Sequence, residues 1–434
     1  MSLANRLGLG SQDHGDNTGL IVAGTAIATT IVLSLLRSYL SPTQPKVIRS
    51  PLRSVLPRLS QDEFDKLEYK PDSFPGARDV ETPYGSIRVY EWGPLTGEKV
   101  VFVHGISTSC ITLTKLANAL VEEKGCRVML FDLFGRGFSD NPADLPHDDR
   151  LYTTQILIAL ASSPDLSWTG PQAFRLIGYS LGGGIAAHFA AAFPHLVSSL
   201  VLLAPAGLIR PESFGTLTRI IFTSGLVPPR VLTWLTRRRL RRPIRSSGKR
   251  GKAAAAAAAN STTSTPSGTP NPNTNTNPNP HPSSTTTPKP DPVTAALTET
   301  TPLIPSPTTP ATDPDSTTLP QRVLRTVHWQ LLHHTGFVPA FISCIQHATS
   351  LMTDQHATWR QLGSRARGST VVVLGADDEI IDPAEYEADA LGLVGGGREE
   401  GGRVVWAVVE GGHDFPMTSD REVLGVVYGA WGWE

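Results

Sequence analysis

The stretch Phe174-Arg175-Leu176-Ile177-Gly178-Tyr179-Ser180-Leu181-Gly182-Gly183-Gly184 decides the fold. An apolar run ends in Gly-x-Ser-x-Gly, and an alanine-rich segment follows it through Ala192. This order predicts a strand that turns sharply into a helix, because Gly178 and Gly182 let the two backbones approach where side chains would clash. We expect Ser180 at the turn in a strained conformation, with its hydroxyl near the positive end of the helix. A lone Gly-x-Ser-x-Gly also occurs by chance, so its companions in the chain decide its meaning.

The overall composition excludes several classes of function. The chain has 434 residues and a formal net charge of -1, so no global field favours a nucleic acid partner. Its three cysteines are too few and too scattered for a disulfide framework or a zinc site. We therefore expect no metal and no cofactor, and a reducing compartment is the simpler assumption.

Short apolar runs rich in β-branched residues recur along the chain and alternate with helical patterns. Strands are expected at 79–83, 86–92, 100–103, 128–131, 174–177, 200–203, 370–374 and 404–409. The first two flank Tyr84-Gly85 and predict a β-hairpin. Apolar strands that alternate with helices predict an α/β fold with a mostly parallel, doubly wound sheet covered on both faces.

The gap between the strands at 200–203 and 370–374 is too long for a simple crossover. Its flanks, at about 212–242 and 321–362, have helical patterns. Its middle, at about 246–320, is made of alanine runs and Asn, Thr, Ser and Pro repeats with almost no apolar side chains. Because such a segment cannot offset its chain entropy by burial, we predict a disordered insertion within a helical cap.

A membrane anchor is predicted near the N-terminus. Residues 19–36 carry no charge, and as a helix they would extend about 27 Å, close to the ~30 Å hydrocarbon core. Basic residues are concentrated after this segment, which predicts a single-pass protein with the remaining chain in the cytoplasm. The endoplasmic reticulum is one candidate membrane. The rival interpretation is a cleaved signal peptide.

Nucleophilic serine chemistry requires a base, an acid that orients the base, and donors for the oxyanion. The predicted base is His413, in a Gly-rich loop directly after the last strand. Four carboxylates compete for the role of acid in the loop after the preceding strand. Asp378 is preferred by its spacing from Gly375, and Asp377 remains the alternative.

Two backbone N–H groups are expected to form the oxyanion hole. One belongs to Leu181, which follows the serine, and the other to Ile106, in the turn after the strand at 100–103. His104 is expected to shape this turn and not to carry a proton.

These residues together resemble the α/β-hydrolase fold-1 family. The matching blocks, in family order, are HGIS at 104–107, DLFGRGFSD at 132–140, GYSLGG at 178–183, GADDEIID at 375–382 and GGHDFP at 411–416. The resemblance covers about 79–207 and 365–432 and implies Ser180 as nucleophile, His413 as base and Asp378 as acid. It also implies a cap inserted after the strand that ends at Leu203. Serine at the elbow argues against the epoxide-hydrolase and dehalogenase branches, which use an aspartate, and the His-x-x-x-x-Asp pattern of acyltransferase relatives is absent.

The predicted domain organisation follows from these segments. It comprises a polar N-terminus (1–18), a transmembrane helix (19–36), a linker (37–78), a first core part (79–207), a cap with its insertion (208–364) and a second core part (365–434).

The predicted function is a membrane-anchored serine hydrolase that cleaves carboxylic esters, with a lipid such as a monoacylglycerol, or another apolar ester, as the substrate. The lipid prediction depends on an apolar segment at 214–235 that is followed by six arginines within 237–245, a pattern suited to an anionic membrane surface. A basic, solvated end of a cap helix explains the same pattern. Two alternatives stay open: a non-catalytic membrane-tethered scaffold, and a peptidase-like or carbon–carbon hydrolase on the same fold. The sequence predicts no oligomeric state.

Overall fold

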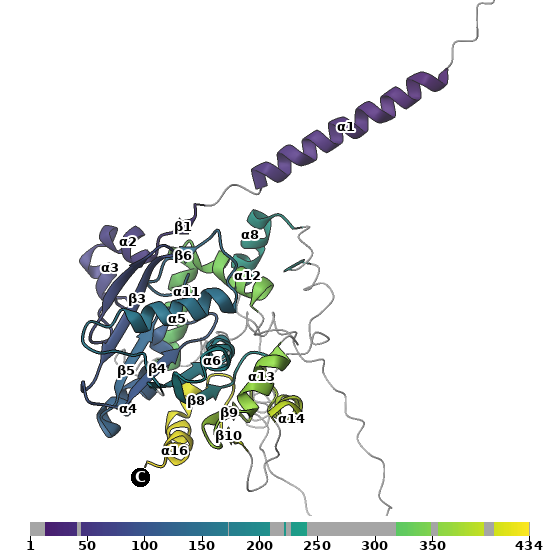
Figure 1. Ribbon diagram of the computed structural model, residues 1–434. Coiled ribbons are helices and arrows are strands. Elements are labelled where there is room, and N and C mark those ends of the chain that lie inside the picture. The colour runs from purple at the N-terminus through teal and green to yellow at the C-terminus, as the bar shows by residue number, and fades with distance from the viewer. Residues whose placement is uncertain are drawn as a thin grey trace, which may run out of the picture.

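The computed structural model describes residues 14–40, 45–171, 173–208, 221–222, 227–240, 318–348, 355–394 and 403–433. Within them an eight-stranded sheet runs through the centre in the order β10-β9-β8-β7-β4-β5-β3-β2 (Figure 1). Its strands are β2 (Arg78–Thr82), β3 (Gly85–Trp92), β4 (Lys99–Val103), β5 (Arg127–Phe131), β7 (Phe174–Tyr179), β8 (Val197–Leu203), β9 (Thr370–Gly375) and β10 (Val404–Val409).

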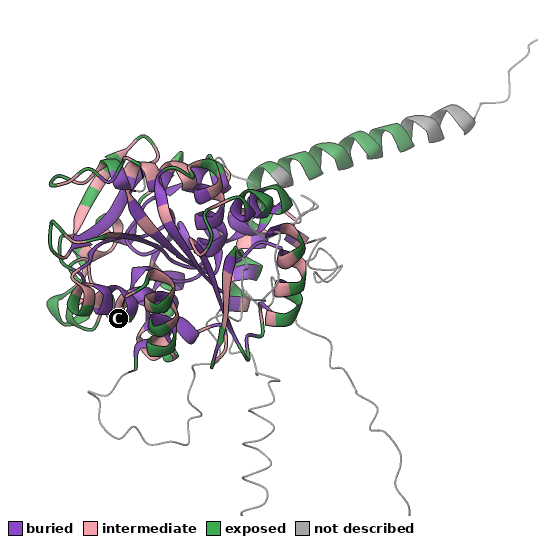
Figure 2. Ribbon diagram, turned by 60° about the horizontal axis from the view of Figure 1, so that its bottom comes forward, coloured by how far each residue is buried: buried purple, intermediate pink, exposed green. Residues whose placement is uncertain are grey.

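The sheet is parallel from β5 to β10 and antiparallel only at β2 and β3. Its inner strands are rich in Val, Leu, Ile and Phe and are almost fully buried, as the purple strands of Figure 2 show. Continuous apolar strands of this kind require cover on both faces. The predicted α/β fold with a mostly parallel sheet is therefore confirmed.

Helices cover the two faces of the sheet. On one face α6 (Leu181–Ala192) packs on β7 and β8, with α5 (Asp149–Ala161) and α13 (His356–Gly363) beside it. On the other face α4 (Thr114–Lys124) packs on β5 and α16 (Asp420–Trp431) on β9 and β10. The short helices η3 (Cys110–Leu113) and α15 (Phe415–Thr418) contact each other, and α14 (Pro383–Val394) packs on α13.

Three helices between β8 and β9 form a separate layer, and we call them the cap helices. They are α8 (Pro229–Leu240), α11 (Leu319–His333) and α12 (Phe337–His347). Helix α11 contacts η3 and α15, which lie in the loops after β4 and β10, and α12 contacts both α8 and α11. The cap helices therefore lie against the loops at the carboxyl edge of the sheet.

The segment before β2 packs on the core, although the sequence predicts a linker there. Strand β1 (Val47–Ile48) pairs with β6 (Asn141–Pro142), and the short helices α2 (Pro51–Ser54), η2 (Leu56–Arg58) and α3 (Gln61–Asp65) follow it. Tyr69 and Phe74 are each only 4% exposed. Aromatic side chains such as these bury enough apolar area to hold a Pro-rich segment in place.

The prediction of a transmembrane helix at 19–36 is wrong. The N-terminal helix α1 extends from His14 to Leu40, and no helix in the described ranges is both long and apolar enough to cross a bilayer. The predicted single-pass membrane localisation with a cytoplasmic catalytic domain is therefore corrected as well.

Several predictions concern residues outside the described ranges. These are most of the polar N-terminus, the insertion up to residue 317, part of the apolar segment at 214–235 and the arginines beyond Leu240.

Candidate active site

Ser180 lies at the sharp turn between β7 and α6. Its backbone has φ 54° and ψ -120°, a conformation that residues other than glycine rarely adopt. Neighbouring strands hold it there, because the Ser180 N–H donates to the Leu203 carbonyl at 2.9 Å and its own carbonyl accepts from Ala206 N–H at 2.8 Å. The expected strained turn is thus present, and it is supported by the end of β8.

The glycines around Ser180 are required by close backbone approach. A Cβ on Gly178 would lie 2.3 Å from the Gly182 carbonyl oxygen, and one on Gly182 would lie 2.2 Å from that of Val103. The backbone segments in these contacts cannot move apart, because they belong to the central strands or to helix α6, which packs on those strands.

We expect Gly182→Ala to lower the free energy of unfolding by about 3 kcal/mol, because the new methyl group must displace backbone atoms of the β4 end. Gly425→Ala in α16 is the matched control, since nothing lies within 4 Å of the added methyl group there. The control should be neutral or slightly stabilising. Urea unfolding of both variants measures the difference, and equal midpoints would contradict the steric argument.

The structure brings Ser180, His413 and Asp378 together. The His413 Nε2 atom lies 3.0 Å from Ser180 Oγ, and its Nδ1 atom lies 2.8 Å from Asp378 Oδ2. The remaining oxygen of Asp378 accepts hydrogen bonds from the N–H groups of Ile380 and Ile381 at 2.8 and 2.9 Å. Each of the three residues is 8% exposed. A carboxylate, an imidazole and a hydroxyl are thus linked by hydrogen bonds in a site that is largely shielded from solvent.

Asp377, the alternative acid, has an exposed side chain. Its N–H donates to the Gly411 carbonyl at 2.9 Å, which joins the loops after β9 and β10. Gly375 permits this contact, because a Cβ there would lie 2.6 Å from the Gly412 carbonyl oxygen. Tyr179 also donates from its hydroxyl to the His413 carbonyl at 3.0 Å. The backbone of the histidine loop is therefore held from two sides.

The two expected oxyanion donors lie in segments that touch. Leu181 is the first residue of α6, so its N–H has no partner within the helix. Ile106 lies in the loop after β4, and Gly182 packs on the carbonyl groups of Val103 and His104 in that loop. The positive end of α6 faces this region. The arrangement is suited to holding a negative oxygen near Ser180.

His104 is buried in the same loop and shapes it. Its Nε2 atom accepts a hydrogen bond from the Leu133 N–H at 2.9 Å, so its Nδ1 atom carries the proton and donates to the Gly105 carbonyl at 2.9 Å. Burial lowers the pKa of His104 to about 3, with a smaller contribution from the nearby Arg136 charge. The imidazole is therefore neutral at physiological pH.

We expect His104 to make the protein less stable in acid. The folded protein resists protonation of His104 down to about pH 3, whereas the unfolded chain binds a proton near pH 6.5, so stability falls as pH drops through this window. The slope is about 1.4 kcal/mol per pH unit. In His104→Gln, which keeps an acceptor for Leu133 N–H, the pH dependence of unfolding between pH 6 and 4 should be shallower by that amount. Identical slopes would contradict a neutral buried His104.

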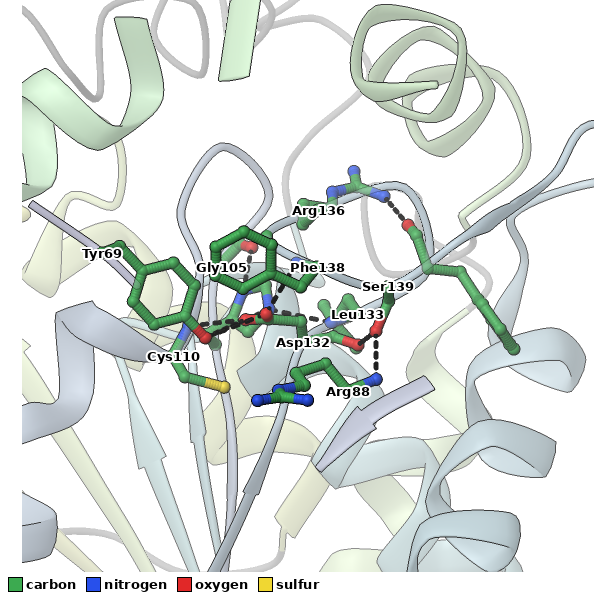
Figure 3. Close-up of polar contacts among 12 residues, drawn as sticks. Tyr69, Arg88, Gly105, Cys110, Asp132, Leu133, Arg136, Phe138 and Ser139 are labelled. Carbon is green, nitrogen blue, oxygen red and sulfur yellow. Dashed lines mark hydrogen bonds and ion pairs between the residues drawn. The ribbon is translucent and has the colours of Figure 1, made fainter. Parts of the chain in front are cut away.

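Asp132 is the centre of a buried polar network beside this loop (Figure 3). Its carboxylate accepts hydrogen bonds from the Tyr69 hydroxyl and from the N–H groups of Cys110 and Phe138 at 2.9 to 3.0 Å. Burial raises its pKa, although these hydrogen bonds oppose the shift. The network joins three segments: the N-terminal segment, the loop after β4 and the loop after β5.

Sequence reasoning overlooked the roles of Tyr69, Arg136, Gln330 and Cys344, all of them buried. The block DLFGRGFSD contained the one available signal, because it places three charged residues, Asp132, Arg136 and Asp140, among apolar residues and glycines directly after a strand. Their partners are distant in the chain and give no local pattern.

Comparison with known proteins identifies the fold. Residues 99–229 match the model of the α/β-hydrolase fold family. The structure superposes on bromoperoxidase from Bacillus anthracis with a TM-score of 0.51 and 15% identity, over 82% of this chain and 99% of that one. This protein has the α/β-hydrolase fold. At this level of identity, the superposition establishes the fold alone.

Curated relatives of this α/β-hydrolase-fold protein match part of its length. A serine hydrolase-like protein of Dictyostelium discoideum is 30% identical over 149 residues, which are 32% of this chain and 39% of the relative. Lipase LipV of Mycobacterium tuberculosis is 33% identical over 120 residues, 28% of this chain and 42% of the lipase. The chain thus spans about two fifths of the length of these relatives.

Proposed function

We propose that the protein is a serine hydrolase that cleaves carboxylic esters through an acyl-enzyme on Ser180. The observation that carries this proposal is the chain of hydrogen bonds from Ser180 Oγ through His413 to Asp378. In this proposal the Asp378 carboxylate keeps Nδ1 of His413 protonated, which leaves Nε2 free to accept a proton.

The proposed reaction has two halves. Ser180 Oγ attacks the ester carbonyl carbon while His413 Nε2 takes the hydroxyl proton, and the N–H groups of Ile106 and Leu181 stabilise the oxyanion. The tetrahedral intermediate collapses, and His413 gives its proton to the leaving alcohol. Water then attacks the acyl-enzyme with His413 as base, and the carboxylic acid is released as Ser180 recovers its proton.

We propose an ester with an apolar acyl group, such as a lipid ester, as the substrate class. Two observations support it: the apolar sequence of cap helix α12 and the similarity to lipase LipV. A series of p-nitrophenyl esters from acetate to palmitate tests this part, and we expect kcat/KM to rise with chain length. A maximum at acetate would contradict it.

Labelling by a fluorophosphonate probe tests the activity itself. Wild-type protein should be labelled at one serine in proportion to its concentration, and Ser180→Ala should not be labelled. Mass spectrometry of the labelled peptide should place the adduct on Ser180. Folded wild-type protein that resists the probe and hydrolyses no ester of the series would overturn the proposal.

A further inference from the structure

Arg136 is a fully buried guanidinium in the loop after β5. Its Nε donates to the Ile106 carbonyl at 2.9 Å, and its Nη1 donates to the Phe134 carbonyl at 2.9 Å and to the Tyr152 hydroxyl at 2.8 Å. Its Nη2 lies 3.2 Å from Cys344 Sγ, in cap helix α12. Among the described residues, none of the groups bonded to Arg136 is a carboxylate. Burying a charged guanidinium without an ion-pair partner costs desolvation free energy, so Arg136 is expected to have a role in function besides any role in stability.

The bonds of Arg136 join the loop after β4 to the cap. One end of the guanidinium holds the carbonyl of Ile106, the residue whose N–H we propose as an oxyanion donor. The other end contacts Cys344 and Tyr152, and the Tyr152 hydroxyl itself lies 3.0 Å from Cys344 Sγ. Figure 3 shows Arg136 on the same loop as Phe138 and Ser139, above the Asp132 network.

A second link runs beside the first. Gln330 of cap helix α11 is fully buried, accepts a hydrogen bond from Gly137 N–H at 2.6 Å and donates to the Ser107 carbonyl at 3.5 Å. Two consecutive carbonyls, those of Ile106 and Ser107, are thus held by Arg136 and Gln330. Because each peptide unit is planar, these bonds fix the two peptide planes that follow Ile106. The plane that carries the Ile106 N–H contains the Gly105 carbonyl, which accepts a hydrogen bond from His104 Nδ1, so Ile106 is held on both sides of its Cα atom.

The loop after β5 also fits tightly against α12 and the residues that precede it. A Cβ on Gly135 would lie 2.4 Å from Ala340 Cβ, so this contact excludes any larger residue. The Asn141 amide donates to the Gly336 carbonyl at 3.2 Å, and His334 Nε2 lies 3.1 Å from the Ser139 carbonyl oxygen. The cap cannot shift here without disturbing the loop that carries Arg136.

We propose that Arg136 is a positioning residue of the oxyanion hole and that, through Cys344, it makes the hole depend on the seating of the cap helices. This inference rests on the proposed serine hydrolase function. Arg136 touches no reacting atom; it acts by holding the backbone on the C-terminal side of Ile106. The cap therefore contributes to transition-state stabilisation and not only to substrate binding.

The test compares matched substitutions on both sides of the link. Arg136→Lys keeps the positive charge but cannot make all four contacts, and Arg136→Met removes both the charge and the contacts. Cys344→Ala removes the cap partner, whereas Cys344→Ser keeps an acceptor in its place. Arg127→Met is the stability control, because Arg127 is also buried (8% exposed, against 0% for Arg136) and pairs with Glu91 at the opposite edge of the sheet.

The readouts are kcat per fluorophosphonate-titrated serine, KM for p-nitrophenyl butyrate and inhibition by an alkyl trifluoromethyl ketone, whose adduct carries an oxyanion. Both Arg136 variants should lose about 10- to 100-fold in kcat and in affinity for the ketone, with KM little changed. Cys344→Ala should lose several-fold in kcat, and Cys344→Ser should recover most of it. Arg127→Met should lower the melting temperature and leave kcat per titrated serine unchanged.

The possible failures are distinguishable. If wild type turns over the ester and Arg136→Lys retains its kcat per titrated serine, the positioning role is overturned while the proposed function stands. The same holds if Arg136→Met only lowers the melting temperature, as Arg127→Met does. If wild type is neither labelled nor active, the proposed function fails and the positioning role falls with it.

Discussion

Ser180→Ala is expected to lower kcat by about 10⁵- to 10⁶-fold and to abolish fluorophosphonate labelling. The hydroxyl supplies the atom that would form the acyl-enzyme, and in the described structure His413 Nε2 approaches Ser180 at 3.0 Å. The backbone turn does not depend on the hydroxyl, because it is held by the Leu203 carbonyl and the Ala206 N–H. The variant should therefore fold normally, with a melting temperature close to that of wild type.

Ser198→Ala serves as the matched control for this result. Ser198 lies near the beginning of β8, at the opposite edge of the sheet, where its hydroxyl donates to the Phe174 carbonyl at 3.0 Å. Its loss should cost about 1 kcal/mol of stability and leave labelling intact. Full ester hydrolysis by Ser180→Ala would mean that another group is the nucleophile.

Asp378→Asn is expected to lower kcat by about 10³- to 10⁴-fold. The carboxylate accepts a hydrogen bond from Nδ1–H of His413, and an amide nitrogen turned toward the ring would favour the wrong tautomer. The two N–H groups of Ile380 and Ile381 orient the carboxylate, and they should hold the amide oxygen in the same place. The amide nitrogen then faces His413, which explains why the loss should be large.

Asp377→Asn makes the same chemical change one residue earlier. Its side chain is exposed, and only its backbone joins the loop of His413. Its kcat should stay within about two-fold of wild type, as is usual for surface substitutions. A larger loss in Asp377→Asn than in Asp378→Asn, measured as kcat per titrated serine, would reverse the assignment of the acid.

Much of the fold could be predicted because its signals are local. The strand–turn–helix around Ser180 needs glycines at fixed positions, and those positions can be read from eleven consecutive residues. The core strands are continuous apolar runs, which a parallel sheet requires wherever both of its faces are covered. His413 could be located from a local signal too, because it lies in the loop directly after the last of these apolar strands.

Local signals failed where the partner is distant in the chain. The Pro-rich segment before β2 was predicted to be a linker, yet the hydroxyl of its Tyr69 donates to Asp132, sixty-three residues later. The segment at 19–36 was predicted to span a membrane from its lack of charge, its length as a helix and the basic residues that follow it. A span also requires length and a sufficiently apolar composition, which no helix in the described ranges combines.

The sequence by itself determined the order of the strands along the chain, the turn at Ser180, and the two loops from which a base and an acid could come. Only the tertiary structure decided which carboxylate meets His413, because Asp377 and Asp378 have the same chemistry and differ in the direction that the loop gives their side chains. It also decided that Arg136 joins the Ile106 loop to Cys344, a contact across 208 residues. Residue type and spacing specify local conformation, whereas the meeting of distant side chains depends on how the sheet and the cap helices pack.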